Sequence, residues 1–484
     1  MNKKKLFRST TLLLALCMLL SCLMACKDKT EDEAPTGDKG ENTYVDSNGW
    51  VYVSPDVNYG GEEFNIYTWS ATDEWVLELN EGTTPIDSKT FYHLSNVEDE
   101  LGVDFRIAQS VSGGWGAHTD FIAKVAMLSG DDKIDLVCQY SLAAIYGVLQ
   151  GLYADLNQVE YINWNAPYWS QEQQEINTLN GKMFYCTGEL SRSVIYNMFA
   201  MSFNYDLAAK YSMGDLYDLV DEGTWTVAKM KELSQDVYGD LNTNDVADAG
   251  DLYGLVIPEV TYLDPMGYGC DIPLLKTSDI GELEVNQDLY TQYGSDVVEA
   301  LIGLSHNNEG AYLSLANGIT YHEAISKNNA VFQVVTVQDI IKRINSSEVN
   351  YGILPMPKYN EQQENYYTAL GMVYNMFSIP VVAPDCDKSA AVLEALAHDG
   401  YSYLTPYLYD QCIKSRYSRR PEDAEMFDIL RDGIVYDPGR VLTNVEIFTF
   451  IRSSVAGQES VSTRYQRKLD IFTSALADVN FAFS

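Results

Sequence analysis

The first part of the chain alternates between strand-like and helix-like patterns of apolar residues. A β-rich stretch, FNIYTW, occupies residues 64–69, and VDFRI at residues 103–107 has the same character. Between them, apolar side chains recur at helical spacing, at Phe91, Leu94, Val97 and Leu101. Ser88 can cap this helix at its N-terminus, and Gly102 can end it. The pattern therefore predicts a strand–helix–strand unit.

The same alternation continues along the chain. A second helix is predicted over residues 119–130, and IDLVC at residues 134–138 predicts a short buried strand. Thr226 can cap a further helix, and residues 252–257 and 330–335 have the character of strands. Strands that alternate with helices predict an α/β layer with parallel strands. From about residue 387 onward the pattern is mostly helical.

The N-terminus has the pattern of an export signal. Residues 3–8 carry four basic side chains, and the apolar run over residues 10–20 is shorter than the roughly 20 residues that span a membrane. LMAC, ending at Cys26, resembles the bacterial lipoprotein box, in which cleavage precedes the lipid-bearing cysteine. We expect a signal peptide over residues 1–25 and a lipidated Cys26 with a flexible acidic tether over residues 26–59. Lipidation at Cys22 and a plain signal peptide are the alternatives.

Composition excludes several classes of function. The 484 residues have a net charge of −37, and removal of residues 1–25, with four basic and no acidic side chains, makes it −41. Such a chain repels phosphates, so we expect no nucleic acid partner. The cysteines after Cys26 are too scattered for a disulfide scaffold, although a bridge stays open among Cys138, Cys186, Cys270, Cys386 and Cys412. No zinc, nucleotide or nucleophile motif is present, so no catalytic residue is assigned.

An aspartate-rich loop, DLNTNDVADAGD at residues 240–251, matches the spacing of an EF-hand calcium loop. The predicted oxygen ligands are Asp240, Asn242, Asn244, the Val246 carbonyl, Asp248 and Asp251. Asp245 stands where the EF-hand has glycine, and Asp251 stands where it has a longer glutamate. We expect a structural Ca²⁺; a solvated acidic loop is the alternative.

Aromatic residues in polar surroundings provide candidate ligand contacts. Trp69 and Trp115 are flanked by polar or glycine residues, and Tyr140 follows the strand that ends at Cys138. The apolar face of a sugar stacks on such rings, and neighbouring amides and carboxylates bind its hydroxyls. Core packing is the alternative for each single ring.

Several segments, in this order, resemble the extracellular solute-binding lipoproteins of bacterial ABC sugar importers, the maltose-binding-protein-like family 1. The segments are IDLVCQY (134–140), GKMFYCTGELSRSVIYNMFAMSFNYDLAAKY (181–211), GTWTVAKMKEL (223–233), VNYGILPMPKYNEQQENYYT (349–368) and TPYLYDQCIKSRYSRRPEDAEMFDIL (405–430). The resemblance implies an α/β, two-lobed periplasmic-binding-protein-like (type II) fold with an interlobe ligand cleft and a helical C-terminal part.

The resemblance also implies how the chain is divided. Lobe one would comprise residues 60–195 plus 326–390, and lobe two residues 196–325 plus 391–484. Ligands of open α/β sheets bind beyond the carboxyl ends of strands. Trp69, Gln139 and Tyr140 fall at such ends in lobe one and are candidate ligand-binding residues. By analogy with the family, Tyr268 and Thr336 would face the cleft, and Trp115, in a glycine-rich loop, is a further candidate.

The implied function is capture of a mono- or oligosaccharide by hinge closure and its delivery to an ABC permease, without catalysis. The partners would be the sugar, the permease and, through the lipid, the membrane, and the protein would act as a monomer on the extracellular face of the cytoplasmic membrane. A secreted glycan-active enzyme, or a binder or sensor of other solutes on the same fold, is the alternative.

Overall fold

The structure is a computed structural model, and it describes residues 43–47, 49–53, 57–68, 81–82, 84–110, 134–278, 281–314, 322–371 and 374–484. The described residues from Tyr44 to Ser484 belong to one compact unit, which contains the two large sheets. The predicted signal peptide, Cys22, Cys26, Trp69, Trp115 and the helix over 119–130 lie outside the described residues. Within the described parts, no helix is both long enough and apolar enough to cross a membrane.

Part of the predicted tether is folded. β1 (Thr43–Val45) and β2 (Val51–Val53) pair as a small sheet. Tyr52 is buried, stacks on His398 with 3.9 Å between ring centroids, and donates a hydrogen bond to Glu100. The prediction of a flexible segment up to residue 59 was therefore wrong from β1 onward. Strand-forming aromatic and β-branched residues around a Ser-Asn-Gly turn outweigh the acidic composition there.

The first sheet has the strand order β15-β5-β3-β4. Its strands are β3 (Glu62–Thr68), β4 (Val103–Ser110), β5 (Leu136–Tyr140) and β15 (Asn375–Ser378). β3 runs parallel to β4 and β5, whereas β15 is antiparallel to β5. Helices α2 (Pro85–Leu101) and α13 (Cys386–Asp399) contact each other beside this sheet. The predicted parallel core is confirmed, with an antiparallel edge strand.

The start of α2 differs from the expectation. Thr84, not Ser88, is the N-cap, because its hydroxyl accepts from the Asp87 N–H while the Asp87 carboxylate accepts from the Thr84 N–H. Pro85 at the first helical position favours this earlier start. Gly102 ends the helix in the left-handed conformation at φ 64°, as its position predicts.

The second sheet has the order β11-β8-β12-β6-β13, with β7 beside β8. The strands are β6 (Phe199–Asn204), β7 (Tyr238–Gly239), β8 (Leu252–Ile257), β11 (Ala311–Leu313), β12 (Ala330–Thr336) and β13 (Tyr351–Leu354). β8 is parallel to β11 and β12, and β6 is antiparallel to β12 and β13.

This topology corrects the predicted division of the chain. Residues 326–390 were expected in lobe one, but β12 and β13 flank β6 in the second sheet. Only β15 returns to the first sheet, and the expected boundary at residue 390 falls inside α13, which contacts α2. Local periodicity identifies a strand but not the sheet that accepts it, since pairing partners are distant in sequence.

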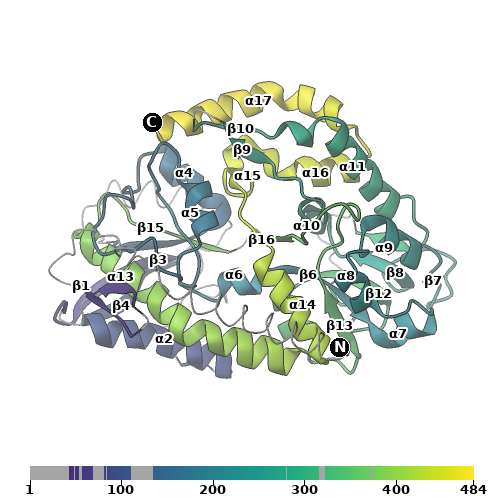
Figure 1. The fold of residues 1–484 in the computed structure, drawn as a ribbon, viewed down its shortest axis with the longest axis horizontal. Helices are drawn as coiled ribbons and strands as arrows, with labels where there is room; N and C mark the ends of the chain where they lie inside the picture. The colour runs from purple at the N-terminus through teal and green to yellow at the C-terminus, as the bar shows by residue number, and fades with distance from the viewer. Residues whose placement is uncertain are drawn as a thin grey trace, which may run out of the picture. The chain divides into compact units, whose positions relative to one another are not determined.

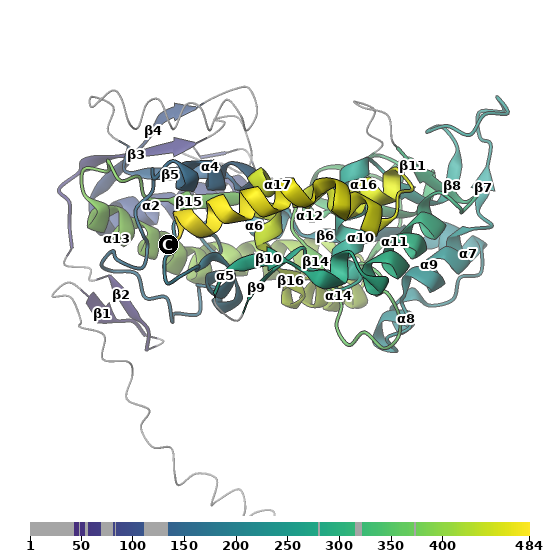
Figure 2. The ribbon, with the colours of Figure 1, turned by 90° about the horizontal axis from the view of Figure 1, so that it is seen from above.

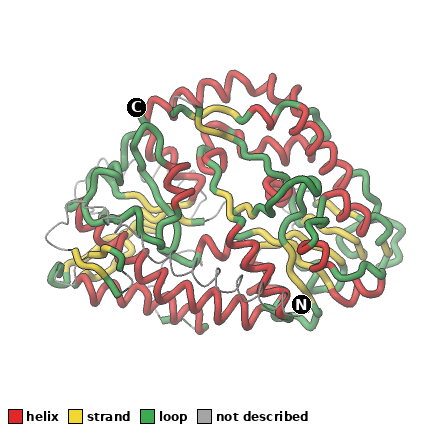
Figure 3. The backbone as a smooth tube through the Cα atoms, in the orientation of Figure 1, coloured by secondary structure: helices red, strands yellow, loops and turns green. Residues whose placement is uncertain are grey.

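Helices surround the two sheets (Figures 1 and 3). Beside the first sheet are η1 (Ser141–Ala143), α4 (Ala144–Leu149) and α5 (Gln171–Asn177), and α6 (Ser193–Tyr196), which contacts α12, lies between the two sheets. The second sheet is accompanied by α7 (Tyr205–Lys210), α8 (Leu216–Asp221), α9 (Val227–Ser234), η2 (Val260–Leu263), α10 (Asp264–Gly269), η3 (Gln287–Leu289), α11 (Gln292–Ser305), α12 (Val337–Asp339), η4 (Ile340–Ile344) and α14 (Pro421–Asp432). Thr226 caps α9 as predicted, accepting from the Lys229 N–H.

Two helical segments connect the sheets. α13 continues without a break through the π-helical η5 (Gly400–Leu404) and η6 (Tyr407–Tyr417) toward α14. The C-terminal α17 (Val461–Ala482) contacts both α4 and α11, and Figures 1 and 2 show its course above the sheets. The helical C-terminal part is thus confirmed.

The remaining elements are short. Two further small sheets pair β9 (Leu275–Thr277) with β10 (Leu283–Val285) and β14 (Thr368–Ala369) with β16 (Ile434–Val435). The last helices before α17 are α15 (Pro438–Val441), η7 (Thr443–Val445), η8 (Ile447–Thr449) and α16 (Phe450–Ala456). These segments bring arginine side chains of α15 and α16 against α10, which matters for the site.

Candidate functional site

A pocket of about 310 Å³ opens where strands of both sheets end. Tyr140 is the last residue of β5 and Thr336 is the last residue of β12, while Glu259 follows the end of β8 by two residues. The connections between the sheets add Asn197 and Gly371 to the wall. The pocket thus lies beyond the carboxyl ends of strands, where ligands bind in open α/β sheets.

Aromatic rings form one part of the wall. Phe199 meets Tyr262 edge to face, with 5.0 Å between ring centroids, and Tyr262 meets His322 at 5.2 Å. Burial raises the pKa of the Tyr140 hydroxyl to about 12 and lowers the pKa of His322 below its usual value. At neutral pH these rings are therefore uncharged, and they offer apolar faces with polar edges, as a sugar requires.

A carboxylate at the end of β12 collects hydrogen bonds. Asp339 accepts from the backbone and hydroxyl of Thr336, at 3.0 and 2.9 Å, and from the Tyr262 hydroxyl at 3.0 Å. Arg343, one helical turn later, donates to its other oxygen at 2.8 Å. Thr336 is also the N-cap of α12, with the reciprocal bonds of a capping box. The start of this helix therefore fixes both the carboxylate and the phenol ring.

A buried ion cluster forms another part of the wall. The Asp264 carboxylate, at the first residue of α10, accepts from Arg440 at 3.0 Å and from Arg452 at 2.8 Å. Arg440 also donates to the Leu370 carbonyl at 2.8 Å. Burial raises the pKa of Asp264, and the two guanidinium groups oppose that rise. The cluster holds Arg440 against the pocket with little freedom to move.

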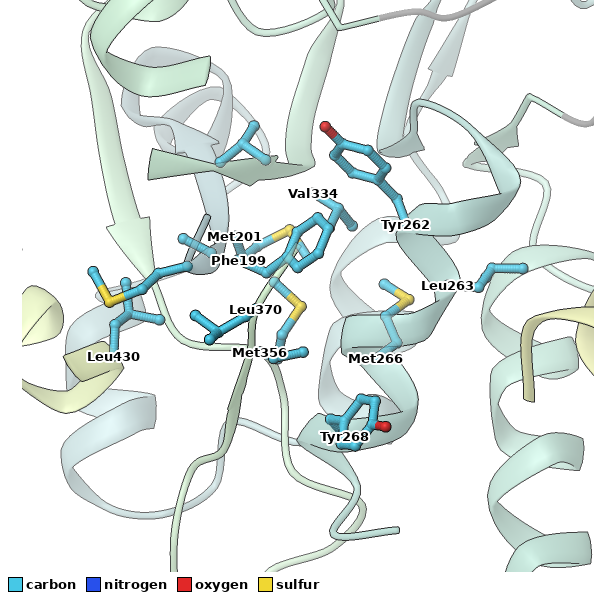
Figure 4. Close-up of a cluster of buried hydrophobic side chains, with 14 of the residues drawn as sticks. Phe199, Met201, Tyr262, Leu263, Met266, Tyr268, Val334, Met356, Leu370 and Leu430 are labelled. Atoms are coloured by element: carbon cyan, nitrogen blue, oxygen red, sulfur yellow. The ribbon is translucent and has the colours of Figure 1, made fainter. Parts of the chain in front are cut away.

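The structure brings together Tyr140 and Thr336 among the residues predicted to bind ligand. Gln139 is buried, donates to Ser378 at 2.9 Å and accepts from Tyr153 at 2.7 Å, so its side chain is used inside the first sheet. Tyr268 is buried as well and donates to Asp437 at 2.9 Å. Figure 4 shows Tyr262 and Tyr268 at opposite ends of the η2–α10 segment, which explains why only Tyr262 lines the pocket.

Sequence reasoning missed most of the polar wall. Asp339 could have been found, because TVQD after a predicted strand has the threonine-to-aspartate spacing of a capping box. Glu259 could have been found as a polar residue just past the strand at 252–257. Asp264 and Arg440 are 176 residues apart, and no local signal joins them.

The aspartate-rich loop is held by its own hydrogen bonds. Asp240 accepts from the Thr243 and Asp245 N–H groups, and the Asn242 and Asn244 amides donate to Asp248 at 3.1 and 2.8 Å. Asp245 has the left-handed conformation, φ 57°, that the EF-hand glycine position demands.

The last predicted ligand of that loop is already engaged. Asp251 is buried, and its carboxylate accepts from the Leu241 and Asp248 N–H groups and the Tyr238 hydroxyl. The described residues hold no cluster of three or more His, Cys, Asp or Glu side chains suited to a metal. The oxygens of Asn242 and Asn244 accept from the Asn244 and Val246 N–H groups, so hydrogen bonds within the loop hold its shape, and Asp251 holds its end.

Known structures share this fold. No protein-family model and no curated protein matches the sequence. The GacH receptor of Streptomyces glaucescens, solved unliganded and with acarbose, matches with a TM-score of 0.56 and 14% identity over 86% of this chain and 99% of that one. An ABC substrate-binding protein from Listeria monocytogenes in complex with cycloalternan matches with a TM-score of 0.56 and 11% identity, over 86% and 99%.

A third match is a cyclo/maltodextrin-binding protein complexed with maltotetraose, with a TM-score of 0.55 and 11% identity over 86% of this chain and 97% of that one. The chain therefore has the type II periplasmic-binding-protein fold. Identities this low establish the fold alone.

Proposed function

We propose that this protein is the substrate-capturing component of an ABC importer and that it binds a mono- or oligosaccharide in the pocket between Tyr140 and Tyr262. Three structural neighbours with the same fold are described as binding acarbose, cycloalternan or maltotetraose. The ligand would bind through both sheets and favour the conformation in which they are close.

The observation that supports this most is the composition of the pocket. Tyr140 comes from the first sheet, Phe199 from the second, and Tyr262 and Asp339 from η2 and α12, which follow strands of the second; all four line the pocket. A ring at the end of the first sheet, facing rings and a carboxylate beside the second, is what hinge closure on a sugar needs. A ligand that contacts only one body would have no reason to favour closure.

A panel of sugars tests the proposal. The purified chain is heated with each sugar, and a bound sugar is expected to raise the melting temperature reversibly. At a hundred times its dissociation constant, a ligand adds about 2.7 kcal/mol to the free energy of unfolding. Recovery of the sugar unchanged by chromatography is expected alongside. If no saccharide shifts the transition, sugar capture is ruled out for the panel.

Non-catalytic binding is part of the same proposal. Asp264 and Asp339, two of the pocket carboxylates, are both held by guanidinium groups. A glycosidase requires one carboxyl group that gives up a proton and a second that acts as base or nucleophile. Ion-paired carboxylates suit neither the donor role nor a free nucleophile. Release of a shorter saccharide during incubation would favour the enzyme over the importer component.

We also propose that the protein acts at the outer face of the cytoplasmic membrane, anchored through lipid on Cys26, as a monomer that meets a permease. The support is the signal-like pattern of residues 1–25 and the lipoprotein-box sequence LMAC. Two acyl chains suffice for stable anchoring, whereas one is marginal.

A further inference from the structure

We propose that the pocket selects a saccharide that carries a carboxylate, such as a uronate, and that this carboxylate binds Arg440 beside Tyr140. This inference rests on the proposed sugar-binding function and names the chemical class of the sugar. It is carried by the buried ion cluster and by the position of that cluster in the pocket.

Arg440 is a buried cation with donors to spare. It is 6% exposed, and its guanidinium makes two hydrogen bonds to described protein groups, the Asp264 carboxylate and the Leu370 carbonyl. A guanidinium carries five N–H donors. The remaining donors belong to a side chain that lines the pocket, so a ligand oxygen can reach them. A carboxylate supplies two acceptors in the geometry that matches a guanidinium.

The local charge also favours an anion. Asp264 is shared between Arg440 and Arg452, so one carboxylate faces two guanidinium groups. Asp264 is the one carboxylate within ion-pair distance of Arg440 among the residues that the structure describes. The charges that act on the Tyr140 hydroxyl are those of Arg440 and Arg452, which both favour its ionised form against the effect of burial. The Tyr140 end of the pocket therefore lies in the field of two guanidinium groups, in a chain with 69 acidic and 32 basic residues.

Neighbouring carboxylates are engaged by other groups. Asp437 is held by the Tyr268 hydroxyl and by the N–H groups of Leu274 and Gly439, and the Tyr268 ring lies 5.6 Å from the Arg440 guanidinium. Asp339 is occupied by Thr336, Tyr262 and Arg343 in its own network.

The pocket consequently has two chemically different ends. The end with Glu259 and Asp339 offers acceptors for sugar hydroxyls, and the end with Tyr140 and Arg440 offers donors and positive charge. A neutral sugar satisfies the first end and offers the remaining guanidinium donors only hydroxyl oxygens. A uronate satisfies both, and planar guanidinium binds carboxylate better than any other side chain does.

The experiment compares matched pairs of sugars on the purified full chain by calorimetry. The pairs are galacturonate with galactose, glucuronate with glucose, and digalacturonate with galactobiose. At least one acid is expected to bind about tenfold or more tightly than its neutral partner, because a charge-assisted pair replaces a hydroxyl contact. Raising the salt from low to high concentration is expected to weaken binding of the acid and not of the neutral sugar.

Variants locate the effect. Arg440→Met is expected to remove the preference for the acid, and Arg467→Met, at an exposed arginine of α17 outside the pocket, is expected to keep it. If Arg440→Met does not fold, the salt dependence of sugar binding to the unaltered chain still tests the preference for the acid. A neutral sugar that binds as tightly as its acid overturns the acidic ligand and leaves sugar capture standing. No binding by either class overturns both.

Discussion

The hydroxyl of Tyr262 donates a hydrogen bond of 3.0 Å to Oδ2 of Asp339, an oxygen that also accepts from the Thr336 hydroxyl. The ring that lines the pocket and the carboxylate that starts α12 therefore form one unit. Because Phe199 packs edge to face against the same ring, the second sheet presents an aromatic surface with a fixed orientation. Pre-organised contacts of this kind raise affinity, since less conformational freedom is lost on binding.

The Tyr262 ring is expected to matter more than its hydroxyl. Tyr262→Ala should weaken binding of the captured sugar by at least about tenfold, because stacking is lost, and Tyr262→Phe should weaken it less. Calorimetry with the tightest sugar of the panel measures both. Tyr351→Phe removes a buried hydroxyl that donates to the Tyr417 carbonyl, away from the pocket, and serves as the control. Unaltered affinity in Tyr262→Ala would contradict this pocket as the binding site.

Thr336 is expected to stabilise the pocket wall as a helix cap. Thr336→Val keeps the shape of the side chain and removes the hydroxyl that accepts from the Asp339 N–H and donates to its carboxylate. Loss of a cap costs about 1 kcal/mol, to be measured by urea unfolding. Thr336→Ser keeps the hydroxyl and should retain most of the stability. Equal stability of all three proteins would show that the capping box contributes nothing.

The contrast between Tyr140 and Gln139 shows how far sequence reasoning reaches. Both follow the strand predicted at residues 134–138, and the rule that ligands bind beyond strand ends cannot choose between them. Successive side chains of a strand point to opposite faces, so adjacent residues do not share a surface. Which face meets the pocket depends on β15, which pairs with β5 from more than 200 residues away. The existence of the strands was predictable, and their neighbours were not.

The role of a charged residue such as Arg440 is equally hard to predict from the sequence. Arg440 lies in a short helix near the C-terminus, and its meaning comes from Asp264 and Tyr140, which other elements bring to it. From the sequence alone, an arginine with no local partner is predicted to be exposed, since arginine is rarely buried without a partner. Long-range packing turns it into a candidate ligand contact.

The loop at residues 240–251 is expected to bind calcium through Asp240, Asn242, Asn244 and Asp248. Calcium should raise the melting temperature, and a chelator should lower it again, because the ion binds the folded loop only. Asp248→Asn should reduce the response by removing a charged ligand. Asp245→Asn, at a loop position with no predicted ligand role, is the matched control. An identical melting temperature with calcium and with chelator would leave the loop as solvated acidic chain.

Cys26 is expected to carry the lipid. In a host with lipoprotein processing, Cys26→Ser should release the protein from the membrane fraction into the medium, whereas Cys22→Ser should leave it membrane-bound. Mass spectrometry of the mature N-terminus should find a lipid-modified residue at position 26. Detection of the modification at Cys22, or of an unmodified N-terminus, would contradict the assignment.

Glu394 on α13 is expected to make stability depend on pH. It accepts hydrogen bonds from Tyr168 at 2.5 Å, Trp169 at 2.9 Å and the Asn163 N–H at 3.2 Å. These bonds favour the ionised form, but complete burial outweighs them and raises the pKa of Glu394 to about 7 from 4.5. The folded protein therefore holds this proton more tightly than the unfolded chain does.

The direction of the pH dependence of stability follows from that difference in proton affinity. The contribution of Glu394 is fully present below about pH 4.5, decreases as the pH rises toward 7, and is constant above that. At about 1.4 kcal/mol per pH unit, the change over this interval is on the order of 3 kcal/mol. The free energy of unfolding of Glu394→Gln is measured in urea between pH 4.5 and 8 and compared with that of the unaltered chain. The difference separates the contribution of Glu394 from those of the other carboxylates. Glu425→Gln, at an exposed position of α14, is the control. Parallel stability curves for all three proteins would mean that Glu394 titrates alike in the folded and unfolded states.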